Sequence, residues 1–238
     1  MDIDDVRPAE QRRACELDTT LLENDPAPGA SRPPVWQPRP HFVFNALNAV
    51  SQLACAGDST GAVACVTVLG DMFQRSLESG GRRVALGEEL AFVPRYLRVE
   101  EARYRRPFPV AVESDAGLER ALVPVFVLQP AVEDVVRHVV ADDLACLSLS
   151  VRARAREGVL DVEVRATGLA GRAPATVAIG DPGLRDLRRW LDREYRGASP
   201  AAMLVRAPDG VAARMWVPLE FPARHAGAKT SAAARTGC

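Results

Sequence analysis

A histidine and a pair of adjacent acidic residues are the side chains in this sequence best suited to chemistry. His41 lies in the run Pro-His-Phe-Val-Phe-Asn at 40–45, and Glu133 and Asp134 follow Leu-Gln-Pro-Ala-Val. A neutral, exposed imidazole can act as a nucleophile toward phosphorus. Adjacent carboxylates can orient or deprotonate that nucleophile and hold a magnesium ion beside a polyphosphate. Together these residue types indicate phosphoryl transfer onto a histidine.

The segment that contains His41 has the pattern of an amphipathic helix beginning at Pro40, because proline is tolerated in a first helical turn. Polar residues at steps of four, three and four share one side of this helix: His41, Asn45, Asn48 and Gln52. The apolar residues that should line the other side are Val43, Leu47, Val50 and Ala54. We therefore expect the His41 imidazole on the solvent-exposed face.

A second helix is predicted after the turn at 57–60, and it should end at Gly80-Gly81. Its apolar residues at helical spacing are Ala62, Val66, Leu69, Phe73 and Leu77. The two helices form an antiparallel hairpin with more apolar surface than the hairpin can cover alone. This excess favours a partner hairpin, most simply in a homodimer.

The rest of the chain changes from helices to a mixture of strands and helices. A third helix is predicted over 87–104, with Pro94 kinking it or marking a restart. The later segments are a strand at 108–113, a helix at 124–140, strands at 146–154 and 159–165, a helix from Asp181 to Tyr195, and strands near 202–207 and 211–219. The predicted fold class is α+β: a helical dimerisation hairpin, then an α/β sandwich with a mixed, mainly antiparallel sheet and helices on one face.

Four regions follow from this pattern. Residues 1–38 are proline-rich at 26–34 and should form a flexible leader, with one short helix near 8–23. The remaining regions are a helical region at 39–104, an α+β region at 105–222 and a disordered tail at 223–238.

Composition excludes several other classes of protein. A net charge of −1 over 238 residues gives no reason to expect direct binding to nucleic acid or to a membrane surface. The five cysteines show no C-x-x-C spacing, which argues against a zinc site and fits a reducing cytoplasm. No run approaches the roughly 18 apolar residues of a membrane span, so a membrane-bound sensor would have to be a separate partner. Lys229 is the only lysine, so arginine, backbone N–H groups or a metal must hold any phosphate.

Four blocks of residues, in order, carry a resemblance that extends over about residues 37–220. The first block is Gln37, Pro40-His41-Phe42, Phe44-Asn45 and Leu47-Asn48. The second is Leu86, Glu89-Leu90, Tyr96-Leu97, Glu100 and Arg103-Tyr104. The third is Pro124, Leu128-Gln129-Pro130, Val132-Glu133 and His138, and the fourth is Gly183-Leu184-Arg185, Leu187, Leu191, Tyr195 and Gly197. With these motifs the chain resembles the LytS/YehU-type sensor histidine kinases of bacterial two-component systems.

The resemblance implies a role for each candidate residue. It makes His41 the phosphoryl acceptor and Glu133 the general base or orienting partner of that histidine. Asp134 stands where the family normally has asparagine as a magnesium ligand, and Arg137 stands where a lysine often meets a phosphate. Further nucleotide-binding residues implied by the glycine-containing motifs are Gly168, Gly183 and Leu184. His138 also matches, but we expect a structural role for it.

The resemblance also implies cofactors and partners. Residues 39–104 would be the dimerisation and histidine phosphotransfer region, and residues 105–222 would be a Bergerat-type (GHKL) ATP-binding domain that uses ATP and Mg²⁺. The partners would be a second copy of the chain and a response regulator, often one with a LytTR DNA-binding domain, whose aspartate receives the phosphoryl group.

Two further positions depart from the family pattern and point to a degenerate ATP site. Ala166 stands where an aspartate receives the adenine amino group, and losing such a charge-assisted bond costs roughly 1.5–3 kcal/mol. Asp181 stands in the phosphate-binding turn, where it would cap the next helix itself and repel phosphate. The sequence therefore leaves two functions open. One is an active histidine kinase, and the other is a catalytically inactive adaptor of the same fold that acts through protein–protein interaction.

Overall fold

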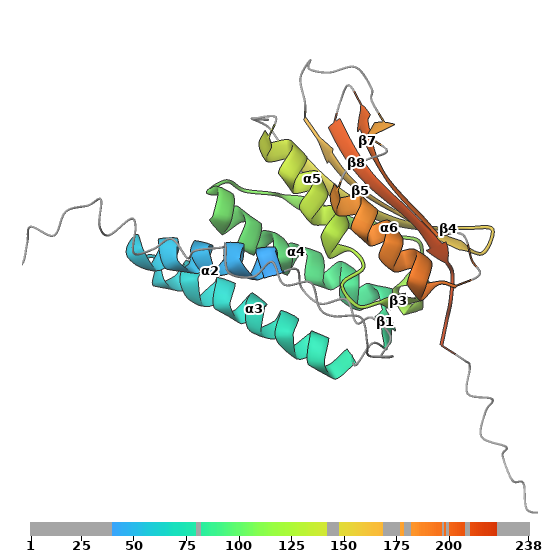
Figure 1. Cartoon of the computed structure of the whole chain (residues 1–238), viewed down its shortest axis with the longest axis horizontal. Coiled ribbons are helices and arrows are strands. Elements are labelled where there is room, and N and C mark those ends of the chain that lie inside the picture. Colours follow the sequence, from blue (N-terminus) through green and yellow to red (C-terminus); the bar gives the residue numbers. More distant parts are fainter. Residues whose placement is uncertain are drawn as a thin grey trace, which may run out of the picture.

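The computed structural model describes residues 40–79, 82–141, 148–168, 177–178, 182–196, 198, 200–207 and 210–222. Its elements, labelled as in Figure 1, are α2 (Pro40–Cys55), α3 (Ser59–Ser79), β1 (Arg83–Ala85), α4 (Leu86–Tyr104), β2 (Val110–Ser114), the 3-10 helix η2 (Leu118–Arg120), β3 (Leu122–Pro124), α5 (Gln129–Ala141), β4 (Ser148–Arg156), β5 (Val159–Thr167), β6 (Val177–Ala178), α6 (Pro182–Glu194), β7 (Ala201–Ala207) and β8 (Gly210–Pro218). The predicted leader helix and tail lie outside the described residues. No helix in the described ranges combines the length and apolar character that crossing a bilayer requires.

The main sheet has six strands in the order β2-β4-β5-β8-β7-β6. Only β2 and β4 pair in parallel, and the other described pairs are antiparallel. The β4–β5 hairpin turns at Glu157 and Gly158, whose φ angles of 48° and 80° both lie in the left-handed region suited to a two-residue hairpin turn. The predicted mixed, mainly antiparallel sheet is confirmed. A two-stranded ribbon of β1 and β3 was not predicted, because three-residue strands show no periodicity.

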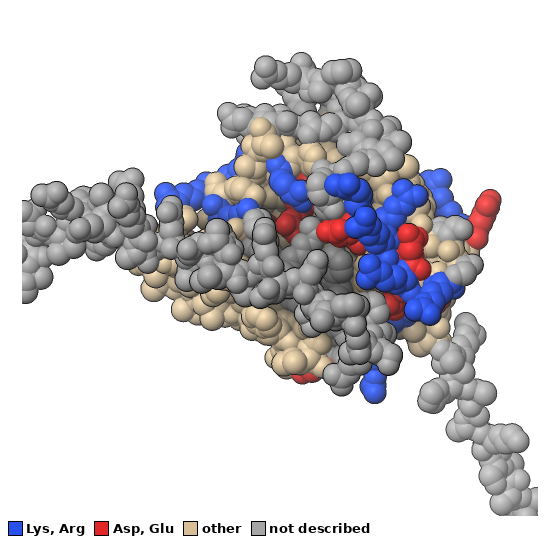
Figure 2. Space-filling view, viewed as in Figure 1, with Lys and Arg blue, Asp and Glu red and all other residues tan. Residues whose placement is uncertain are grey.

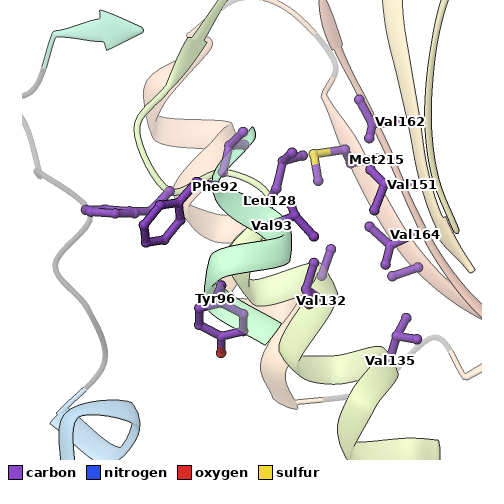
Figure 3. Close-up of a cluster of buried hydrophobic side chains, with 14 of the residues drawn as sticks. Phe92, Val93, Tyr96, Leu128, Val132, Val135, Val151, Val162, Val164 and Met215 are labelled. Carbon is purple, nitrogen blue, oxygen red and sulfur yellow. The ribbon is translucent and has the colours of Figure 1, made fainter. Parts of the chain in front are cut away.

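Helices cover one face of the sheet (Figure 1). α5 packs on β5 and β8, while α6 packs on β7 and against α5. Side chains alternate along the strands, so one set points toward the helices. Figure 3 shows this inner set facing apolar residues of α4 and α5 and of the turn before α5; its labelled members from the sheet are Val151, Val162, Val164 and Met215. The predicted fold class is therefore confirmed.

α6 is divided between a buried face and a charged face. Its buried residues are Leu184, Leu187, Trp190 and Leu191. Its exposed residues are Arg185, Asp186, Arg188, Arg189, Asp192 and Arg193. In the space-filling view of Figure 2, arginine side chains gather over the position of α6 with acidic side chains among them. The spacing of the buried residues follows the period of 3.6 and holds this helix on the sheet by one face.

The α2–α3 hairpin packs against α4, and α4 packs against α5. The hairpin interface is made mainly by small and medium side chains: Ala46, Ala49, Cys65, Val68 and Met72 are buried. The predicted burial of Leu47 and Ala54 is wrong, because both are exposed. Apolar residues surround much of α2, so its periodicity alone did not identify the face that meets α3 and α4. The hairpin, α4 and the sheet contribute to one buried cluster.

Two predicted helix features need correction. α4 runs without a break from Leu86 to Tyr104, with Pro94 inside it and exposed, so the helix does not restart there. α5 begins at Gln129 rather than at 124, because 122–124 is a strand and 125–128 is a buried turn. The run Val-Pro-Val-Phe-Val-Leu at 123–128 is uniformly apolar apart from its proline, and such a run cannot be distinguished from a buried helix by periodicity.

Candidate active site

His41 is the second residue of α2, so the predicted helix around it is confirmed. Its side chain is not among those that the structure describes. Farther along the predicted polar side, Asn45 and Asn48 are half-buried and Gln52 is exposed. The solvent exposure of the imidazole therefore stays a prediction.

Asp134 points into the protein from α5. The residue is 0% exposed, and one carboxylate oxygen, Oδ1, forms an ion pair with Arg137, whose side chain is 41% exposed. The other oxygen, Oδ2, is buried and has no hydrogen-bond partner within the described part of the chain. A buried carboxylate oxygen with free acceptor capacity is a chemically suitable ligand for Mg²⁺. The metal-binding prediction for Asp134 thus fits the local chemistry.

Glu133 faces a different environment from Asp134, because adjacent residues on a helix do not share a side. It is half-buried, and its charge acts on Tyr96 and Glu100 of α4. The two acidic residues that are neighbours in sequence therefore do not form one cluster. α4 packs against both the α2–α3 hairpin and α5, and it lies between them (Figure 1). α2, which carries His41, and α5, which carries Glu133, are therefore on different sides of α4.

His138 lies one turn after Asp134, and its Nδ1 is 2.7 Å from the backbone carbonyl oxygen of Asp134. With Nδ1 protonated, the ring donates a hydrogen bond to that oxygen, which holds the imidazole against its own helix. This contact agrees with the structural role expected from the sequence.

The residues predicted for the nucleotide lie at the end of β5 and the start of α6. Gly168 follows β5 with a φ of 112°, a backbone conformation that favours glycine. Gly183 is in the first turn of α6, and Leu184 is buried in the core. Asp181 lies outside the described residues. The roles of Gly168, Gly183 and Leu184 in nucleotide binding stay predictions.

Ala166 is completely buried in β5, where it is paired with Leu149 and Val211. Its methyl group offers no hydrogen-bond acceptor to a purine amino group. The chemistry at the two predicted ends of the nucleotide site therefore differs: Asp134 and Arg137 suit a metal and a phosphate, whereas Ala166 does not suit an adenine amino group.

Two buried carboxyl groups on α4 belong to Glu89 and Glu100. Both residues belong to the second of the four sequence blocks, but no role is predicted for either. The Tyr96 hydroxyl donates to Glu100 Oε1 over 3.1 Å, and Arg103 Nη1 lies 3.4 Å from Glu100 Oε2. Burial raises the pKa of Glu100, the Arg103 guanidinium opposes this shift, and the Glu133 carboxylate adds to it. Their burial could have been predicted from the sequence, since both are acidic residues at positions that fall on the apolar side of the helix.

Replacing Glu100 with glutamine should flatten the pH dependence of stability. The raised pKa means that folded Glu100 takes up its proton at a higher pH than the unfolded chain does. The free energy of unfolding therefore gains a contribution as the pH falls through the folded-state pKa, with a slope of at most about 1.4 kcal/mol per pH unit. Urea unfolding between neutral pH and about pH 5 measures this slope.

Glu88→Gln, an exposed change on the same helix, is the matched control and should keep the wild-type slope. Equal slopes for Glu100→Gln and the wild type would contradict the assignment of this contribution to Glu100.

The described part of the chain thus combines a histidine near the start of a helical hairpin with a mixed sheet whose covering helix α5 carries a buried carboxylate. Residues 36–108 match the family model described as "Histidine kinase". Part of the chain is 31% identical over 129 residues to the sensor histidine kinase BtsS of Escherichia coli K12, covering 53% of this chain and 23% of BtsS. It is 35% identical over 134 residues to the sensor protein LytS of Bacillus cereus, covering 56% of this chain and 22% of LytS. Over part of its length the chain is thus similar to sensor histidine kinases that include LytS and BtsS, and the matched segment spans less than a quarter of the length of each of these two proteins.

Among solved structures, the comparison matches the chain with the histidine kinase domain of a blue-light activated histidine kinase from Erythrobacter litoralis. That match has 19% sequence identity and a TM-score of 0.42, and it covers 75% of this chain and 74% of the other.

Proposed function

We propose that this chain is the kinase core of a two-component system, in which ATP phosphorylates His41 and an aspartate of a response regulator then accepts the phosphoryl group. The observation that carries the proposal is the position of His41 in the first turn of α2, inside the region that matches the histidine kinase family model. A second observation in its favour is the Asp134 carboxylate, which lies on the opposite side of α4 and is buried with one oxygen unsatisfied.

The proposed roles follow from the contacts of each residue. Bound ATP and Mg²⁺ would supply the γ-phosphoryl group and neutralise its charge. Asp134 would hold the metal through Oδ2, and the half-exposed Arg137 would meet a phosphate. Glu133 would take the ring proton that His41 loses when its other nitrogen becomes bonded to phosphorus. Since α4 lies between α2 and α5, this transfer requires α5 to move relative to the hairpin or the α5 of a second copy to approach His41.

A homodimer through the hairpin is part of the proposal. The apolar residues on the outer side of α3 are widely exposed: Val63 65%, Val66 51%, Phe73 48% and Leu77 82%. With Gly70 they recur at steps of three, four, three and four, which is the spacing of a coiled-coil seam. A second hairpin packed on this seam would complete a four-helix bundle. The proposed location is the cytoplasm, with a response regulator, of LytTR type or another type, as the receiving partner and a membrane-bound sensor as a further candidate.

Titration of the full chain with magnesium-ATP, followed by a search for acid-labile, base-stable phosphate, tests the proposal. We expect binding in the micromolar range and a label that is lost in His41→Ala. His138→Ala is the matched control, since the His138 ring is bonded to the backbone of its own helix, and this variant should keep the label. Absence of binding at millimolar nucleotide would instead support an adaptor of the same fold, and a label that survives His41→Ala would contradict His41 as the acceptor.

A further inference from the structure

A buried ion pair joins the hairpin to α4. Arg75 Nη2 of α3 lies 2.7 Å from Glu89 Oε1 of α4, and the two side chains are 21% and 0% exposed. The Arg75 guanidinium also lies over two aromatic rings, 4.9 Å from the centre of the Phe92 ring and 5.9 Å from that of Phe126. Arg75 is therefore held at once by a charge and by two ring faces in a largely water-free site.

The same carboxylate holds the turn that leads into α5. The backbone N–H groups of Phe126 and Leu128 both hydrogen-bond to Glu89. With its amide nitrogen turned toward these acceptors, Gln129 donates to Glu89 Oε2 over 3.2 Å and to the Phe126 carbonyl oxygen over 2.9 Å. Glu89 thus connects a residue of the hairpin with the first residue of α5.

The turn itself has an unusual backbone. Phe126 has a φ of 62°, in the left-handed region that bulky residues rarely adopt. Such a conformation persists only when the surroundings specify it. Here the surroundings are the Glu89 carboxylate, which receives the Phe126 N–H, and the edge-on packing of the Phe126 and Phe92 rings, whose centres are 6.3 Å apart.

The contacts of this site fix the relative positions of α3, α4 and the start of α5 more than they increase the stability of the protein. Burial raises the pKa of Glu89, while the Arg75 charge and the two backbone N–H groups oppose that shift. Apolar residues of similar size often stabilise a core as well as a buried ion pair does. A network of directed bonds, however, is satisfied in only one arrangement of its members.

We propose that Arg75 and Glu89 are positioning residues: they set the start of α5, and hence Glu133 about one turn later, relative to the hairpin that carries His41. A rotation of α3 would move Arg75, and through Glu89 it would change how α5 begins. The inference rests on the proposed function, because it concerns the approach of Glu133 and Asp134 to the reaction at His41.

Amide hydrogen exchange on the full chain tests the connection without any reaction. In both Arg75→Met and Glu89→Gln, exchange at residues 126–132 should become about tenfold faster or more, while β4 and β5 keep their protection. Arg75→Lys retains the charge and should show a smaller increase, which keeps the test decisive if Glu89→Gln does not fold. Glu88→Gln, exposed on the same helix, should exchange like the wild type. Unchanged exchange at 126–132, or faster exchange throughout the sheet, would overturn the inference.

The rate of His41 labelling tests the consequence for the site. Both variants should lower the maximal rate about tenfold or more and leave the half-saturating ATP concentration unchanged, and the double variant should be no slower than either alone. Wild-type rates or multiplying losses would contradict positioning by a single unit. If the wild type takes no label, the proposed function fails, while the exchange experiment still decides whether Arg75 and Glu89 hold the start of α5.

Discussion

Replacing Phe73 and Leu77 of α3 together with glutamate should convert a dimeric protein into a folded monomer. Both side chains are exposed in the single chain, so the substitutions remove no contact that holds one copy together. Burying such a side chain in an interface contributes about 1.5–3 kcal/mol, and in a symmetric dimer each loss counts twice. The dissociation constant should therefore rise on the order of a thousandfold or more, with the added carboxylates repelling one another.

Analytical ultracentrifugation over a range of concentrations measures this change, and circular dichroism checks that the helices remain. Thr67→Glu is the matched control, because Thr67 is exposed on α3 but lies off the seam. The control should stay dimeric. A wild type that is monomeric, or a double variant that still dimerises, would rule out this seam as the interface.

Introducing a carboxylate by Ala166→Asp should destabilise the protein without nucleotide and make its stability depend on ATP. The side chain is fully buried and points into the apolar layer, where an unpaired carboxyl group costs about 3–5 kcal/mol, so the melting temperature should fall markedly. If the adenine amino group comes to this position, it supplies the missing donor, and saturating magnesium-ATP should recover about 2–3 kcal/mol. Thermal unfolding with and without nucleotide measures both effects.

Ala153→Asp provides the control for this second prediction, since Ala153 is equally buried on the inner side of β4. It should destabilise to a similar extent but gain no ATP-dependent recovery. GTP should not rescue Ala166→Asp, because guanine presents an oxygen where adenine presents its amino group. If Ala166→Asp responds to ATP no more than Ala153→Asp does, even when combined with Asp181→Gly, the account of a degenerate adenine site is wrong.

Much of the fold could be predicted from the sequence because its helices and strands have a clear apolar periodicity or are bounded by turn residues. The strands predicted at 146–154 and 159–165 flank Glu157-Gly158 and correspond to β4 and β5, and the helix predicted over 87–104 corresponds to α4. The start of α5 could not be predicted, since the apolar run at 123–128 has no period, and its turn is held by Glu89 from elsewhere in the chain. The orientation of the hairpin also escaped prediction. Leu47, which the apolar pattern places on the buried side of its helix, is 39% exposed.

The candidate site could be predicted only in part. His41, Asp134 and Arg137 follow from motifs, and the structure adds that Asp134 is buried with one oxygen free. Which of Glu133 and Asp134 faces the core depends on the rotation of α5 about its axis, which residue order does not reveal. The network around Glu89 depends on a distant turn and on Arg75, and no local pattern connects these three segments.

The continuous core has a consequence for protein engineering. Phe92, Val93 and Tyr96 of α4 lie against the side chains of α5 and its preceding turn (Figure 3), so the boundary predicted between residues 104 and 105 separates segments of chain that share one core. A fragment that starts at residue 105 would leave Leu128 and Val132 facing water. A chimera that joins the sheet and its helices to a foreign sensor therefore has to include α4, or the foreign protein has to supply another apolar surface that covers α5.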